Sequence, residues 1–105
     1  PIMTSQQEGH IVAISSIASY LPVSQWAVYS AAKQSLRYLC DALRRIVKKD
    51  GILLTVISPG YIKTPLTARN THNMSQLMTL ETGVNKIYKS NWIRKKTNKI
   101  KRQVF

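Results

Sequence analysis

Two short, continuous apolar runs flank a long amphipathic segment, and this order restricts the chain to few folds. The first run, HIVAISS, covers residues 10–16, and the second, ILLTVI, covers residues 52–57. Apolar runs of this length without polar alternation are typical of strands that are covered on both faces, as in a parallel sheet. Parallel strands need a long crossover connection, most often a helix. The pattern therefore predicts an α/β fold that contains a right-handed βαβ unit.

The segment between the two runs has the period of a helix from about residue 26 to residue 49. Its apolar side chains form one stripe, and its polar side chains lie elsewhere on the helix. The members of the stripe are Leu36, Leu39, Cys40, Leu43, Ile46 and Val47. Lys48 and Lys49 suit the negative end of the helix dipole, and Asp50-Gly51 provides a stop. A single helix of this length is therefore expected to connect the strands.

A second helix is expected after an irregular segment that extends from Gly60 to about Met78. Thr79 can cap this helix, and Gly83 in its interior is expected to weaken it. The apolar residues that should share one of its faces are Leu80, Val84, Ile87 and Tyr88. Beyond Trp92 we expect disorder. The sequence thus predicts a folded part, residues 1–92, and a basic tail, residues 93–105.

Charge and composition exclude several classes of protein. The formal charge is +12, and six of the sixteen Lys and Arg residues lie between residues 94 and 102. Blocks of like charge are usually solvated ends, and only two aromatic residues flank this one, so the tail does not favour nucleic-acid binding. Cys40 is the only cysteine, which excludes an internal disulfide, and no metal-ligand cluster is visible. No run approaches the roughly 18 apolar residues of a membrane span, so the cytoplasm is the expected location.

Three side chains that can exchange a proton with a carbonyl oxygen converge on one end of this unit. Tyr29 and Lys33 stand four residues apart at the head of the helix, and Ser16 lies thirteen residues before Tyr29. A free phenol keeps its proton up to about pH 10, but an ammonium group one helical turn away stabilises its anion. A hydroxyl at the end of a strand can hydrogen-bond the substrate oxygen. The three residues indicate acid–base chemistry beside a hydride donor.

Each of these residues also has a purely structural interpretation. A Tyr-x-x-x-Lys spacing arises often by chance, so Tyr29 is alternatively an aromatic residue at a helix entry and Lys33 an exposed cation. Ser15 competes with Ser16, but the spacing to Tyr29 favours Ser16. The alternative for Ser15 is a strand residue that points to the other face of the sheet, because side chains alternate along a strand. The placement of the three residues strengthens the chemical interpretation, because ligands of open α/β sheets bind outside the carboxyl ends of the strands.

The sequence GHIVAISSIASYLPVSQWAVYSAAKQSLRYLCDALRRIVKKDGILLTVISPGYIKTPL, residues 9–66, resembles the carboxyl-terminal half of a short-chain dehydrogenase/reductase. Residues 67–88 resemble that family more loosely. The resemblance implies that residues 1–92 form part of a Rossmann-like domain, a doubly wound parallel sheet with a βαβ crossover. It implies an NAD(P)-dependent oxidoreductase that transfers a hydride between nicotinamide and a small carbonyl or alcohol substrate.

The same resemblance implies roles for individual residues. Tyr29 becomes the general acid or base, Lys33 holds the ribose hydroxyls of the cofactor, and Ser16 orients the substrate. The turn at Pro59 and Gly60, together with the backbone near Ile62, lines the nicotinamide pocket. Thr64 corresponds to the position that contacts the carboxamide or the phosphates. The cofactor is NAD or NADP, and the residues that would distinguish them are not among these.

The family's glycine-rich phosphate turn is not among the 105 residues, which contain only four scattered glycines. We therefore expect a fragment of a family member. The alternative is a non-catalytic remnant that acts through its basic tail or docks on a full-length homologue. In the family the helix that corresponds to residues 26–49 commonly pairs subunits, so Leu36, Leu39 and Leu43 are expected to need a partner, such as a second copy of the chain.

Overall fold

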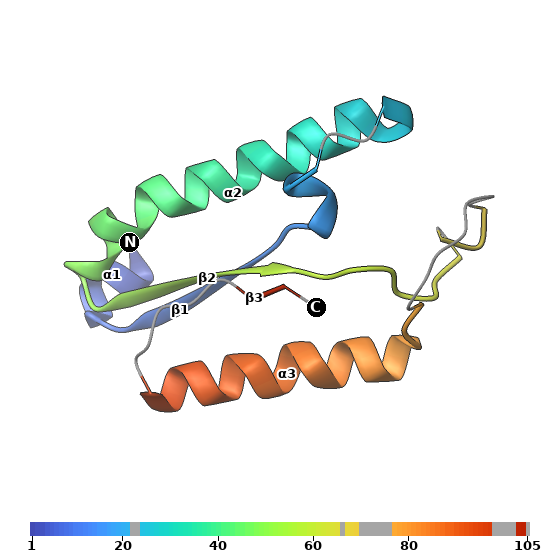
Figure 1. Ribbon diagram of the computed structural model, residues 1–105. Coiled ribbons are helices and arrows are strands. Elements are labelled where there is room, and N and C mark those ends of the chain that lie inside the picture. Colours follow the sequence, from blue (N-terminus) through green and yellow to red (C-terminus); the bar gives the residue numbers. More distant parts are fainter. Residues whose placement is uncertain (22–23, 66, 70–76, 98–102, 105) are drawn as a thin grey trace.

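A computed structural model describes residues 1–21, 24–65, 67–69, 77–97 and 103–104. The helices are α1 (Ile2–Gln6), α2 (Ala27–Lys48) and α3 (Leu80–Thr97), and the strands are β1 (Gly9–Ile14), β2 (Ile52–Ser58) and β3 (Gln103–Val104). Three short 3-10 turns are η1 (Ile17–Ser19), η2 (Ser24–Trp26) and η3 (Thr67–Arg69). Helices α2 and α3 lie on opposite sides of the sheet (Figure 1). The architecture is α/β, as the sequence predicts.

The sheet is parallel and has the strand order β1-β2-β3. Strands β1 and β2 pair over their whole length, from Gly9 opposite Ile52 to Ile14 opposite Ile57. Helix α2 makes the connection between them, so the predicted βαβ crossover is confirmed. This arrangement brings the carboxyl ends of β1 and β2 to the same edge of the sheet, beside the first turn of α2 (Figure 1).

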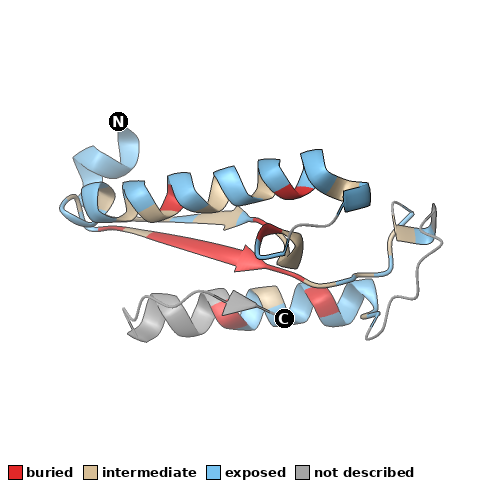
Figure 2. Cartoon of the chain, turned by 45° about the horizontal axis from the view of Figure 1, so that its top comes forward, coloured by how far each residue is buried: buried red, intermediate tan, exposed pale blue. Residues whose placement is uncertain are grey.

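Strand β2 forms the centre of the core and appears as the most buried element in Figure 2. Val56 and Ile57 are 1% and 0% exposed, because helices cover both faces of this central strand. Leu54 and Val56 form a buried cluster with Cys40 of α2. In contrast, Ile11 and Ile14 of the neighbouring strand β1 are about two-fifths exposed (39% and 43%). The continuous apolar run thus predicts full burial correctly for β2 but not for β1.

Only part of the predicted apolar stripe of α2 faces the sheet. Leu36 and Val47 pack against the core cluster beside Cys40, whereas Leu39 and Ile46 are 56% and 62% exposed. At 100° per residue, the six residues of the stripe cover an arc of roughly 120°. The two long strands contact only one side of this arc. The other side leaves an apolar strip on the outer surface of the helix.

The apolar residues that the sequence places on one face of α3 are mostly exposed. Leu80, Val84 and Tyr88 are all more than half exposed, and Ile87 is partly buried. Within residues 80–90, the part of the helix whose burial is described, the buried residues are Gly83 and Ser90. A Cβ atom added to Gly83 would lie 2.8 Å from Cδ1 of Ile62, so the helix comes closest to the preceding loop where it has no side chain. The predicted cap is confirmed, since Thr82 N–H donates to Oγ1 of Thr79 at 3.2 Å.

Regular structure continues beyond residue 92, where the sequence suggested disorder. Helix α3 extends to Thr97, and residues 103–104 pair with β2. Arg and Lys are good helix formers and suit the carboxyl end of a helix dipole, which explains why a basic segment can prolong this helix. The remainder of the expected tail, residues 98–102 and 105, lies outside the described residues.

No helix in the described part of the chain is long and apolar enough to cross a membrane.

Candidate active site

Main-chain hydrogen bonds continue past the end of β1 and bring Ser16 beside the turn that follows β2. Ser15 N–H donates to the carbonyl oxygen of Ile57 at 2.7 Å, and Ile17 N–H donates to the carbonyl oxygen of Pro59 at 3.0 Å. Ser16 lies between these two bonds. Two of the segments that the sequence places at the carboxyl edge, the end of β1 and the Pro59-Gly60 turn, are therefore adjacent.

Tyr29 and Lys33 lie on the same side of α2, as their spacing predicts. Nζ of Lys33 is 5.8 Å from the centroid of the Tyr29 ring. The same ammonium group donates to the carbonyl oxygen of Ile14 at 3.0 Å, so it joins the helix to the end of β1. Tyr29 is 40% exposed, and its ring makes an edge-to-face contact with Trp26. A phenol reachable from solvent thus lies beside a fixed positive charge.

The structure separates the two candidate serines. Ser15 is 3% exposed, and its hydroxyl donates to the carbonyl oxygen of Lys33 at 2.9 Å. Ser16 is only partly buried, and its Oγ accepts a hydrogen bond from Ala18 N–H at 3.2 Å. Within the described ranges, the hydroxyl proton of Ser16 has no acceptor. Ser15 is therefore a structural residue that fixes β1 to α2, whereas Ser16 can still donate to a substrate oxygen.

Ile62 and Thr64 belong to a turn with its own hydrogen bonds. Thr64 N–H donates to Oγ1 of Thr67 at 2.8 Å, and that hydroxyl donates to the carbonyl oxygen of Ile62, also at 2.8 Å. Lys63 N–H donates to the carbonyl oxygen of Met78, and Met78 N–H donates to the carbonyl oxygen of Tyr61. These bonds form an isolated β-bridge between this turn and the segment just before α3. No hydrogen bond between described residues joins Ile62 or Thr64 to Ser16, Tyr29 or Lys33. Sequence reasoning missed Thr67, although a Thr-x-x-Thr spacing is a signal for this reciprocal cap.

Arg37 is a second residue that sequence reasoning missed, because its position on α2 suggested a solvated polar side chain. Its Nη2 donates to the carbonyl oxygen of Ser19 at 3.1 Å, in the turn that follows Ser16. Its guanidinium carbon lies 4.1 Å from the centroid of the Tyr20 ring. A cation–π contact between Arg37 and Tyr20 could have revealed this role, but a sequence rarely shows which aromatic residue a given Arg contacts.

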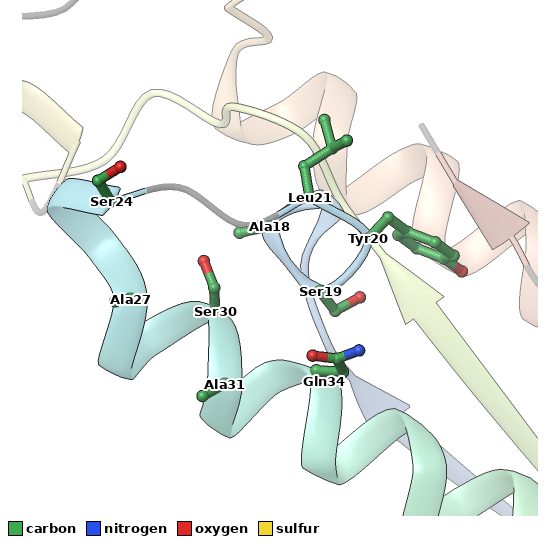
Figure 3. Close-up of a pocket in the computed structure, with 9 residues that line it drawn as sticks. All are labelled: Ala18, Ser19, Tyr20, Leu21, Ser24, Ala27, Ser30, Ala31 and Gln34. Atoms are coloured by element: carbon green, nitrogen blue, oxygen red, sulfur yellow. The ribbon is translucent and has the colours of Figure 1, made fainter.

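A pocket of about 400 Å³ lies between η1 and the first turns of α2 (Figure 3). Ala27, Ser30, Ala31 and Gln34 line it from the helix, at a spacing that places them on one face. Tyr29, Lys33 and Ser16 are not among its lining residues. The pocket is thus distinct from the candidate acid–base pair.

Cys40 lies away from this pocket, in the core. Burial raises the pKa of the Cys40 thiol above its usual range, which argues against a nucleophilic role for that residue.

Among the described residues, no group of three or more His, Cys, Asp or Glu side chains could hold a metal ion.

Comparison with protein families gives a match over most of the chain. Residues 1–75 match the family model described as short chain dehydrogenase. A dehydrogenase/reductase SDR family protein 7-like from Anopheles gambiae is 45% identical over 67 residues, which are 64% of this chain and 21% of that protein. An uncharacterized oxidoreductase from Myxococcus xanthus is 37% identical over 78 residues, 74% of this chain and 31% of that protein. The chain thus spans less than a third of the length of these curated relatives.

Solved structures show the same fold. A short-chain dehydrogenase from Sphingobium yanoikuyae in complex with NADPH has a TM-score of 0.79 at 20% identity, covering 99% of this chain and 39% of that one. A short chain dehydrogenase from Burkholderia cenocepacia J2315 in complex with NADP has a TM-score of 0.81 at 17% identity, covering 100% of this chain and 40% of that one. At such identities the likeness concerns the fold alone. It identifies the βαβ unit as part of a Rossmann-like domain.

Proposed function

Because the chain belongs to the short-chain dehydrogenase family of oxidoreductases, we propose that it carries the acid–base residues of an NAD(P)-dependent oxidoreductase. The reaction is hydride transfer between nicotinamide and a small carbonyl or alcohol. The observation that carries this proposal is the placement of Lys33, whose ammonium group lies 5.8 Å from the Tyr29 ring and is fixed to the end of β1. This geometry supports the proposal, because it places a phenol beside an ammonium group at the edge where such sheets bind ligands.

In the direction of reduction, Tyr29 donates its phenolic proton to the carbonyl oxygen of the substrate. The Ser16 hydroxyl donates a hydrogen bond to the same oxygen, which orients the carbonyl and stabilises the charge that develops on it. Lys33 stabilises the phenolate that Tyr29 leaves behind. The nicotinamide, when bound, supplies the hydride. In the direction of oxidation the same phenolate accepts the proton of the alcohol.

The donors of Lys33 also fit the cofactor. An ammonium group has three N–H donors, and the carbonyl oxygen of Ile14 accepts one of them. The remaining donors are available for the ribose hydroxyls. We assign the nicotinamide wall to Pro59 and Gly60, which lie beside Ser16, and to the backbone of Ile62. A contact from Thr64 to the cofactor requires its hydroxyl to exchange its present partner, Thr67, for the ligand.

The chain covers less than a third of the length of its curated relatives, so it supplies only part of the cofactor site of such proteins. We propose that residues 1–92 correspond to the carboxyl-terminal half of the family's Rossmann-like domain. The basic residues that follow continue α3 to Thr97 and include the short strand β3, which pairs with β2. The 105 residues contain no glycine cluster that could hold the pyrophosphate. The cofactor therefore binds to this chain mainly through its nicotinamide end, in either the NAD or the NADP form.

Fluorescence titration with NADH and NADPH, combined with turnover of a carbonyl probe such as acetoin, tests this proposal. We expect saturable binding, and we expect Tyr29→Phe to retain it while turnover falls about 100- to 10,000-fold, the usual contribution of a general acid. Tyr38→Phe is the matched control, because Tyr38 is a 64% exposed tyrosine on the same helix. A folded chain without a saturable response to either cofactor would contradict the proposal.

A second candidate function is docking on a full-length homologue, and the outer surface of α2 favours it. Val28, Leu39 and Ile46 are 86%, 56% and 62% exposed, which is a large apolar area for a free helix surface. Sedimentation of the chain alone and with a full-length family member measures association. We expect Leu39→Glu combined with Ile46→Glu to abolish it. Gln34→Glu, which adds a charge to the same helix outside this strip, serves as the control.

A further inference from the structure

We propose that Arg37 is a positioning residue, which fixes the turn that carries Ser16 onto the helix that carries Tyr29 and Lys33. This role rests on the proposed function, because it concerns the placement of the substrate-orienting hydroxyl relative to the acid–base pair. Arg37 follows Lys33 by one helical turn and Tyr29 by two. One helix therefore presents both the acid–base pair and the clamp.

Arg37 holds the turn by two different contacts. Its Nη2 donates to the carbonyl oxygen of Ser19 at 3.1 Å, and Ser19 is only 2% exposed. Its guanidinium carbon also lies over the Tyr20 ring, 4.1 Å from the ring centroid, and 5.6 Å from the centroid of the Tyr38 ring. Ser19 and Tyr20 belong to the turn that faces α2 in Figure 3. The side chain thus joins two consecutive residues of the turn to the helix.

Hydrogen bonds transmit this attachment to Ser16. The hydroxyl of Ser19 donates to the carbonyl oxygen of Ser16 at 2.7 Å, and Ser19 N–H donates to the same oxygen at 3.0 Å. Ala18 N–H donates to the Ser16 hydroxyl oxygen. Residues 16–20 therefore form one hydrogen-bonded unit. The bonds of Ser15 and Ile17 fix the beginning of this unit, and Arg37 fixes its far end.

A guanidinium group suits this position better than any other cation. It is planar, so it can stack on an aromatic ring while its edge donates a hydrogen bond, which an ammonium group cannot do in the same geometry. Nε of Arg37 is buried and has no partner in the described part of the chain. An unsatisfied buried donor lowers stability, so stability alone does not explain an arginine at position 37. Its role in placing the turn does explain it.

Amide hydrogen exchange on the full chain tests the role. In Arg37→Ala we expect the amides of Ala18, Ser19 and Tyr20 to exchange at least about 10-fold faster, since a charge-assisted bond and a stacking contact are both lost. The amides of β1 and β2 should keep their exchange rates. Arg45→Ala, an exposed arginine on the same helix, should change neither set. Unchanged rates in the turn, or a parallel acceleration throughout the sheet, would overturn the proposal.

Two further variants keep the result specific. Tyr20→Phe retains the ring, and its amides should exchange like those of the parent chain, whereas Tyr20→Ala should accelerate exchange of the same three amides.

In the turnover assay, Arg37→Ala should lower kcat about 10-fold at an unchanged dissociation constant for the cofactor, because Ser16 is displaced and Lys33 is not. A kcat equal to that of the parent chain would exclude a positioning role. If the parent chain shows no turnover, the proposed function fails, and the exchange rates alone decide whether Arg37 holds the turn.

Discussion

Helices α2 and α3 cover opposite faces of one sheet, yet they are held to it in different ways (Figure 2). Side chains of α2 reach the main chain of the strands at two points, from Lys33 to Ile14 and from Arg44 to Leu54. Helix α3 instead buries the small residues Gly83 and Ser90, and Gly83 lies against the side chain of Ile62 in the preceding loop. The hydroxyl of Ser90 bonds to its own helix. Directional polar bonds fix a helix in register with a strand, whereas a contact with a loop does not. The candidate chemistry lies on the helix that is fixed.

The largest expected difference between the two sides is in core packing. Leu54, 6% exposed, belongs to the cluster with Cys40, and Leu54→Ala should lower the free energy of unfolding by about 2–5 kcal/mol, the cost of a cavity in a core. Val84 of α3 is 54% exposed, and Val84→Ala should change it by less than about 0.5 kcal/mol. Urea denaturation followed by circular dichroism measures both. Equal losses would mean that the side of the sheet covered by α3 is packed as tightly as the side covered by α2.

The polar attachment of α2 should account for the next largest effect. Nε of Arg44 donates to the carbonyl oxygen of Leu54 at 3.1 Å, and its Nη1 is 2.6 Å from a carboxylate oxygen of Asp41. Arg44→Met keeps the aliphatic stem but removes both bonds, which should cost about 1–3 kcal/mol of unfolding free energy. Arg45→Met, the exposed neighbour, is the matched control and should be close to neutral. If the two variants behave alike, the Leu54 bond does not hold α2 to the sheet.

The sequence predicts most of this fold, because apolar runs and a helical period report burial directly. The predicted strands, residues 10–16 and 52–57, and the predicted helix, residues 26–49, agree with β1, β2 and α2 to within two residues. The spacing to Tyr29 favours Ser16 over Ser15, and Ser15 is the serine whose hydroxyl is buried in a bond to the helix. The same-side placement of Tyr29 and Lys33 is confirmed, while their catalytic roles stay predictions.

The missed features depend on what lies opposite each side chain, which a local pattern does not contain. Arg37 and Arg44 occupy helix positions that suggest solvent, but main-chain carbonyl groups of a turn and a strand face them. The sequence pattern places apolar residues of α3 on one face but does not say what that face meets, and Leu80, Val84 and Tyr88 are more than half exposed. A loop residue, Ile62, approaches the helix at Gly83.

The smallest expected effect concerns Gly83, where two contributions of opposite sign meet. Replacing a glycine in a helix interior by alanine gains about 1 kcal/mol from chain entropy. The new Cβ would lie 2.8 Å from Cδ1 of Ile62, the end of a flexible side chain whose displacement costs about 0.5–1.5 kcal/mol. Gly83→Ala should therefore leave the free energy of unfolding within about 0.5 kcal/mol of the parent value.

Gly83→Val sharpens this prediction, because its γ carbons cannot be accommodated by a shift of Cδ1 alone. We expect it to lower the free energy of unfolding by about 1–3 kcal/mol, as overpacking does. In an Ile62→Ala background the penalty should largely disappear, since the atoms that the valine would meet are removed, and the double-mutant cycle should give a clear coupling energy. Additive effects of the two substitutions would mean that Gly83 is not packed against Ile62. Helix α3 would then lack the close contact that distinguishes its attachment from that of α2.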